Sequence, residues 1–199
     1  RSKHKIIIPA CPSTIGELPL QLTEPRTIWW DEGLWLIDQT QLPEKLVPLK
    51  IESIRQLVAA IQSLSIRGAP ALGAAGAYSI ALAAERSHAT NAFDMIDELE
   101  LAADMIRSSR PTAINLSWGV DRALKEARVG VSTEEIREAA LRSAEGIAEE
   151  DIRVNRALGK NGAKLLEDGD TILTHCNAGR LACVGWGTAL GVVRSAVEL

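Results

Sequence analysis

The chain has 199 residues, of which 46% are hydrophobic and 24% are charged, a composition typical of a folded globular protein and not of a disordered or repetitive one. Its formal net charge of -4 gives no basic field for a polyphosphate backbone, so nucleic acid is not an expected partner, although a local basic pocket is compatible with it. Three cysteines without metal-ligand spacing predict free thiols, no metal site and a reducing, cytoplasmic environment.

Neither of the two most apolar runs in the sequence suggests a targeting or membrane segment. The apolar run of residues 6–8 is interrupted at once by Pro9 and Pro12, which does not fit a signal peptide. Residues 68–84 carry no charge, but alanine and glycine dominate them, and the run is short for a membrane span. We therefore expect a buried helix there and no membrane partner.

The first predicted elements are two short strands. Residues 27–30 and 34–37 are rich in β-forming side chains, and the turn between them ends in Gly33. This pattern predicts a β-hairpin. The following residues 41–49 contain two prolines and are expected to form a connector.

Helical patterns dominate the middle of the chain. Apolar residues recur at helical spacing over residues 51–64, and Pro70 is well placed in the first turn of the Ala/Gly-rich helix that follows. Asn91 can cap a further helix that ends before Pro111, and residues 115–127 predict another.

A long helix is expected next. Residues 132–135 read Ser-Thr-Glu-Glu, a capping-box pattern, and helical periodicity continues far beyond them. Gly159 and Gly162 mark the points where this helix could break.

The pattern changes at residues 168–170, which read Asp-Gly-Asp and predict a turn. Residues 171–175 suit a buried parallel strand, and the apolar segment that continues through Val193 is expected to be helical. A lone parallel strand needs partner strands. We therefore expect an α/β protein with an N-terminal domain over residues 1–168 and, over residues 169–199, the first strand and helix of a Rossmann-like parallel-sheet domain that is truncated here.

A candidate anion site lies at residues 67–70, which read Arg-Gly-Ala-Pro. They place a guanidinium and free backbone N–H groups at a helix start, where the positive end of the dipole favours an anion. A phosphate could accept hydrogen bonds from the amides of Gly68 and Ala69 while Arg67 supplies charge. A tight turn with a surface arginine explains the same residues equally well.

Two further residues are weaker candidates when each is taken alone. Arg110 lies in a loop between two helices, where an arginine more commonly interacts with the negative end of a helix dipole than with a ligand. Cys176 follows the predicted strand, at the edge where ligands bind in open α/β sheets, but a small buried hydrophobe is the commoner role for such a cysteine. Cys183 is expected to be a residue of that buried kind.

Three segments in combination resemble the methylthioribose-1-phosphate isomerases, a family related to subunits of translation initiation factor 2B. They are residues 66–73, Ile-Arg-Gly-Ala-Pro-Ala-Leu-Gly, residues 109–118, Ser-Arg-Pro-Thr-Ala-Ile-Asn-Leu-Ser-Trp, and residues 174–179, Thr-His-Cys-Asn-Ala-Gly. Residues 29–33 and 36–43 also fit, so the likeness covers the chain from about Thr27.

This resemblance implies a helical N-terminal domain with a small antiparallel sheet, a Rossmann-like C-terminal domain and usually a homodimer. It implies interconversion of 5-methylthioribose 1-phosphate and 5-methylthioribulose 1-phosphate in methionine salvage, without a dissociable cofactor. Carried over by position, Arg67, Gly68 and Ala69 would bind this sugar phosphate, Arg110 would hold its phosphate and Cys176 would be catalytic. The family's catalytic aspartate has no counterpart here, so the isolated chain is expected to be inactive.

Two alternatives stay open. A ribose-1,5-bisphosphate isomerase would use the same arginines on a substrate with a second phosphate, but the Cys-Asn-Ala-Gly stretch favours the methylthio branch. A regulatory subunit of the initiation factor 2B kind would act by protein contact and would not need a reactive cysteine. The joint presence of Arg67, Arg110 and Cys176 disfavours it.

Overall fold

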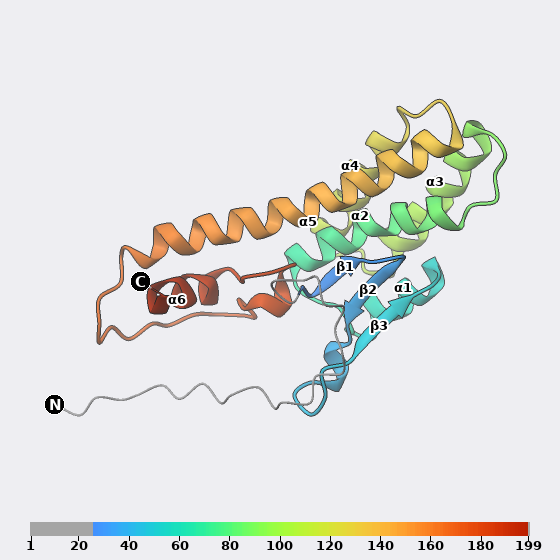
Figure 1. The fold of residues 1–199 in the computed structure, drawn as a ribbon. Helices are drawn as coiled ribbons and strands as arrows, with labels where there is room; N and C mark the ends of the chain where they lie inside the picture. The colour runs from blue at the N-terminus through green and yellow to red at the C-terminus, as the bar shows by residue number, and fades with distance from the viewer. Residues whose placement is uncertain (1–25, 199) are drawn as a thin grey trace.

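Two antiparallel strands open the fold in a computed structural model that describes residues 26–198 (Figure 1). β1 (Ile28–Trp30) and β2 (Leu34–Ile37) form the predicted hairpin, in which Trp29 lies opposite Trp35. The turn brings Gly33 to a φ of 133°, a conformation that glycine adopts without strain.

A third strand, β3 (Pro48–Ile51), pairs antiparallel with β2 and completes a sheet in the order β1-β2-β3. The connector predicted over residues 41–49 is therefore wrong at its C-terminal end. Pro48 is the first residue of an edge strand, where its missing N–H is tolerated.

The helices that follow the sheet lie where the sequence predicts them, except that Ile51, which was included in the first helical pattern, ends β3. They are α1 (Ile54–Gln62), α2 (Ala69–Arg86), α3 (Ala92–Ser109), α4 (Ile114–Ala127) and α5 (Thr133–Ala163). Ser53, Asn91 and Ser132 cap α1, α3 and α5, because each side chain accepts a hydrogen bond from a backbone N–H in the first turn.

The uncharged run of residues 68–84 forms most of α2, which is buried along nearly its whole length between α4 and α5 (Figure 1). Small side chains permit this burial. A Cβ on Gly119 of α4 would overlap the carbonyl oxygen of Gly73 in α2, so the two backbones are in direct contact. Within residues 26–198, no helix combines the length and the apolar character that crossing a membrane requires.

The C-terminal segment departs from the prediction. Residues 171–175 are exposed and form no strand. After Cys176 only the short 3-10 helix η2 (Arg180–Ala182) forms before α6 (Ala189–Glu198), the α-helix of this segment. The physical reason is the lack of a partner: among the described residues, the only sheet is the three-stranded antiparallel one, and it does not include them. The described chain is thus mostly helical with a small antiparallel sheet, and the α/β class is not realised within it.

α6 packs along the C-terminal half of α5 (Figure 1). Gly159 and Gly162 lie on the contacting face of α5, where a Cβ would meet Ser195 or Val192 of α6. The long helix is therefore confirmed, and it runs without a break through both glycines. No finding tests the domain boundary at residue 168, which stays a prediction.

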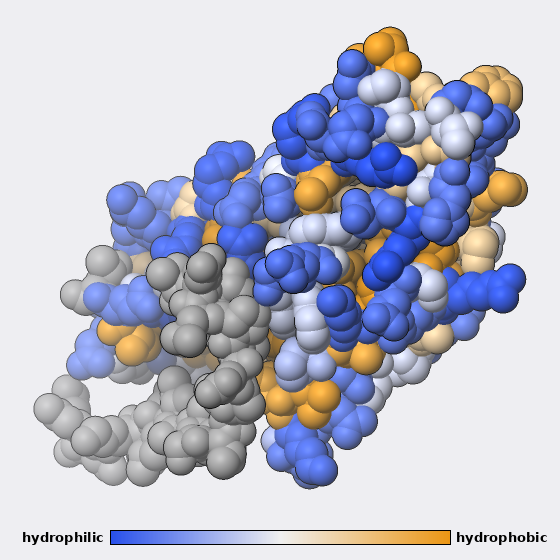
Figure 2. Space-filling view, turned by 45° about the vertical axis from the view of Figure 1, so that its right-hand side comes forward, coloured by the Kyte–Doolittle hydropathy of each residue, from blue (hydrophilic) through white to orange (hydrophobic). Residues whose placement is uncertain are grey.

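Figure 2 shows a mostly hydrophilic face on which hydrophobic surface occurs in separate places. Exposed apolar side chains include Val129 and Val131, between α4 and α5, and Leu173 in the segment before α6. Single exposed apolar residues are normal on protein surfaces and do not by themselves mark a site.

Candidate functional site

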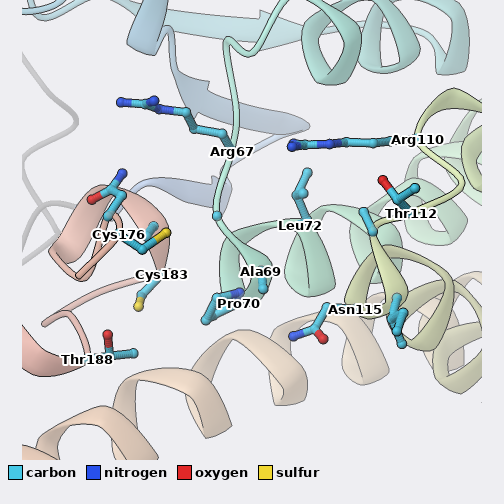
Figure 3. A pocket seen from close by; sticks show the side chains of 15 residues that line it. Arg67, Ala69, Pro70, Leu72, Arg110, Thr112, Asn115, Cys176, Cys183 and Thr188 are labelled. Carbon is cyan, nitrogen blue, oxygen red and sulfur yellow. The ribbon is translucent and has the colours of Figure 1, made fainter.

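A cavity of about 610 Å³ brings together all five site residues that the sequence predicts (Figure 3). Arg67, Gly68 and Ala69 reach it from the start of α2, Arg110 from the end of α3, and Cys176 from the segment before α6. The other lining residues are Pro70, Leu72, Thr112, Ala113, Ile114, Asn115, Asn177, Ala182, Cys183 and Thr188.

Two helix N-termini open onto this cavity. Gly68 precedes α2 and Ala113 precedes α4, and neither helix start is capped by a side chain. The three helices α1, α3 and α5 begin elsewhere and are all capped. Because the first backbone N–H groups of a helix have no partner within it, two uncapped starts at one cavity provide donors and positive dipole ends for an anion.

Two arginines add charge to the same cavity. Arg67 is exposed, and its Nε donates a hydrogen bond to Oε1 of Gln39 at 3.4 Å. Arg110 is half-buried, and its Nη1 is buried without a hydrogen-bond partner among the described residues. Figure 3 shows the Arg110 side chain extending toward the segment that carries Arg67. In the same view the Arg67 side chain extends away from Arg110. Each guanidinium can give charge-assisted hydrogen bonds to an anion in the cavity.

Gly68 is required for two reasons. Its φ is 96°, in the left-handed region that side-chain-bearing residues rarely adopt. A Cβ there would also overlap the backbone of Ala182. The glycine thus lets the start of α2 and the segment around Ala182 meet backbone to backbone at the cavity wall.

We call residues 176–188 the cysteine segment. The residue directly before the sheet, Thr27, holds this segment from one side. The backbone N–H of Thr27 donates to the carbonyl oxygen of Val184 at 2.9 Å, and its hydroxyl donates to the carbonyl oxygen of Arg180 at 3.1 Å. Thr27 lies directly before β1, so the start of the hairpin fixes a cavity wall that is more than 150 positions away in sequence.

α5 holds the cysteine segment from the other side through Asp151. Its Oδ2 accepts a hydrogen bond from the backbone N–H of Val184 at 2.7 Å, and its Oδ1 accepts one from Nδ2 of Asn155 at 2.9 Å. Burial raises the pKa of Asp151, and the hydrogen bonds from Val184, Gly185 and Asn155 counteract part of that rise. The carboxylate acts as an internal acceptor.

The two described cysteines differ in environment. Cys176 is exposed and has a φ of 68°, whereas Cys183 is fully buried. Burial, together with the negative charge of Asp151, raises the pKa of Cys183 to about 12. The prediction that Cys183 is a buried small residue is confirmed. Cys11 lies outside the described residues.

The setting predicted for Cys176 is wrong. It does not follow a strand, and no helix begins directly after it whose amides could stabilise a thiolate. The residue nevertheless lines the cavity, because the hydrogen bonds around Val184 bring the cysteine segment back against the sheet and α5.

Sequence reasoning missed Gln39 and Asp151. A signal for Asp151 was present, because Ile147, Asp151, Asn155 and Gly159 follow one another at intervals of four and so share a helix face that is otherwise buried. An acid among such positions indicates a side chain that receives hydrogen bonds from another element.

The fold and the cavity together define a mostly helical domain suited to hold a small anion beside an accessible thiol. The chain belongs to the Initiation factor 2 subunit family, whose profile matches residues 65–199. The family resemblance that the three motifs indicated is thereby confirmed.

Named relatives refine the comparison. The chain is 58% identical over 173 residues to a putative methylthioribose-1-phosphate isomerase of Archaeoglobus fulgidus, covering 87% of this chain and 51% of the relative. It is 41% identical over 175 residues to the methylthioribose-1-phosphate isomerase of Herpetosiphon aurantiacus, covering 87% and 49%. The chain thus spans about half the length of the curated relatives it matches.

Solved structures agree on the fold. A crystal structure described as translation initiation factor eIF-2B, subunit delta, from A. fulgidus matches with a TM-score of 0.82 and 58% identity, covering 87% of this chain and 51% of that one. The 5-methylthioribose 1-phosphate isomerase of Pyrococcus horikoshii OT3 matches with a TM-score of 0.82 and 37% identity, covering 88% and 50%.

Proposed function

We propose that the protein to which these residues belong is an aldose–ketose isomerase that converts 5-methylthioribose 1-phosphate to 5-methylthioribulose 1-phosphate. One observation carries the proposal: Arg67, Arg110 and Cys176 line a single cavity together with two uncapped helix starts. Relatives that are 41% to 58% identical to the chain bear the name of this activity.

The two arginines and the amides at the start of α2 would bind the phosphate on C1 of the sugar. Isomerisation then requires that the bond between C1 and the ring oxygen breaks while that oxygen takes up a proton. One hydrogen moves from C2 to C1, and the C2 hydroxyl loses its proton to become the ketone. Cys176 would exchange a proton with the reacting sugar from its exposed position on the cavity wall.

A substrate assay of the protein at its natural length tests the proposal. We expect conversion of 5-methylthioribose 1-phosphate, followed by nuclear magnetic resonance, and a loss of at least about a hundredfold in kcat for Cys176→Ala. Cys183→Ala is a comparison variant: this thiol also lines the cavity, but it is buried and its pKa is raised to about 12, so kcat should fall much less than for Cys176→Ala. Normal turnover by Cys176→Ala would remove the catalytic assignment.

Assays of the same natural-length protein distinguish two further candidate functions. A ribose-1,5-bisphosphate isomerase would turn over the bisphosphate in preference to the methylthio sugar. The second candidate is not an enzyme but a regulatory subunit, and the A. fulgidus structure described as an eIF-2B subunit is the observation that supports it. Binding to a GTPase without turnover of either sugar would support that candidate.

We also propose a homodimer, as the family resemblance implies. Light scattering on the natural-length protein should give twice the mass of its polypeptide, and the mass of a single chain would contradict this.

A further inference from the structure

A buried glutamine joins two walls of the cavity. Gln39 begins η1 (Gln39–Gln41), the short turn after β2, and is only 9% exposed. Its Nε2 donates to the carbonyl oxygen of Leu181 at 2.8 Å, and its Oε1 accepts from Nε of Arg67 at 3.4 Å. One carboxamide thus connects the cysteine segment with the arginine at the start of α2.

The backbone fixes this carboxamide in place. The N–H of Gln39 donates to the carbonyl oxygen of Ser65 at 3.0 Å, two residues before Arg67. Because the main chain and the side chain of Gln39 are both held, Gln39 is a fixed point to which a long and exposed arginine side chain is attached.

The contact atom matters for binding. A guanidinium held at Nε leaves the edge formed by its two Nη groups available, in the fork geometry that binds two oxygens of one phosphate. Glutamine is neutral, so it orients Arg67 without cancelling the charge that attracts the anion.

We propose that Gln39 is a positioning residue, which directs the Arg67 guanidinium toward a bound phosphate and couples its position to the cysteine segment. This inference rests on the proposed function, in which the cavity binds a sugar phosphate. Gln39 itself does not line the cavity and would not touch the substrate.

Gln39→Met tests the inference in the natural-length protein. Methionine has a similar volume but removes both hydrogen bonds. Titration calorimetry with inorganic phosphate is expected to show affinity about tenfold weaker, the size of effect that one or two such bonds produce. In an isomerase assay, KM should rise by a similar factor while kcat changes less.

Gln41→Met is the matched control, because Gln41 belongs to the same turn, is exposed and does not line the cavity. Its phosphate affinity should equal that of the wild type. Gln39→Glu keeps an acceptor for Arg67 but loses the donor to Leu181 and neutralises charge, so it should bind phosphate at least as weakly as Gln39→Met. This second variant also serves if Gln39→Met does not fold.

A double-mutant cycle with Arg67→Met separates positioning from general support of the fold. If Gln39 acts through Arg67, adding Gln39→Met to Arg67→Met should weaken phosphate binding no further. Additive losses, or unchanged phosphate affinity with a lowered melting temperature, would overturn the inference, as would a wild-type protein that binds no phosphate. A wild type that binds phosphate but isomerises no sugar would refute only the proposed function.

Discussion

Arg110 carries a charged group that the fold leaves without a full set of partners. Its Nη1 is buried and has no hydrogen-bond acceptor within residues 26–198. A buried N–H in this state destabilises a fold by about 1–3 kcal/mol. Such a group is understandable beside a cavity, where a ligand oxygen can become its acceptor.

Replacing Arg110 by Met should therefore separate binding from stability. We expect phosphate affinity to fall by at least about tenfold, because a charge-assisted hydrogen bond is lost. The free energy of unfolding in urea should stay equal or rise, since an unpaired buried group is removed.

Arg128→Met is the control, because Arg128 caps the end of α4, pairs with Glu100 and lies outside the cavity lining. It should leave phosphate affinity unchanged. If Arg110→Met instead kept its phosphate affinity and lowered the free energy of unfolding, Arg110 would be a partner of the α3 dipole, the alternative that its sequence position suggests.

The two described thiols should differ sharply in reactivity. Because the pKa of Cys183 is raised to about 12, its reactive thiolate is only about a thousandth of the population at pH 9 and increases tenfold with each further pH unit. Cys176 is exposed, so a reagent in solution can reach its thiol. Iodoacetamide at pH 8 followed by peptide mass mapping should label Cys176 and leave Cys183 unlabelled in the folded protein. Equal labelling would show that Cys183 is not enclosed as described.

At the scale of elements, the junction between α2 and the cysteine segment depends on one glycine. Gly68→Ala would force a side chain into a left-handed conformation and against Ala182, so we expect a loss of about 1–3 kcal/mol in the free energy of unfolding. The cavity wall should shift as well, and phosphate affinity should fall with it.

Gly146→Ala provides the opposite case. Gly146 lies within α5, and a Cβ there would meet nothing within 4 Å, so alanine should stabilise the protein by about 0.5–1 kcal/mol. Urea unfolding measures both variants. Equal effects of the two substitutions would contradict the close contact at Gly68.

Local signals in the sequence predicted most elements correctly. The caps Asn91 and Ser132 and the helical spacing of apolar residues are properties of a single segment, so they can be recognised without knowing the fold. The strand predicted over residues 171–175 depended instead on partner strands that the described residues do not provide.

The candidate site was predictable to a similar degree. Arg67, Gly68 and Ala69 follow from a local motif, whereas Arg110 and Cys176 were weak candidates alone and the resemblance strengthened them. The roles of Gln39 and Asp151 could not be predicted in this way, because their partners, Leu181 and Val184, are brought to them only by tertiary folding.

At the scale of the whole molecule, the described lining of the cavity contains binding groups but no carboxylate. Within residues 26–198, none of the residues that line it is an aspartate, glutamate or histidine, side chains that commonly serve as general acid or base. The 199-residue chain produced alone is therefore expected to show no isomerase turnover, measured against the natural-length protein at equal concentration. Turnover by the chain alone would show that its own residues complete the reaction site.

The cavity also lies at the end of the most deeply buried helix. α2 is enclosed by α4 and α5, so the groups proposed to receive the phosphate are attached directly to the hydrophobic core. Because this wall is already ordered, ligand binding would cost little conformational entropy of the protein. Hydrogen exchange should accordingly be slowest along α2 in the free protein, so that the phosphate-binding wall is preorganised before any substrate arrives.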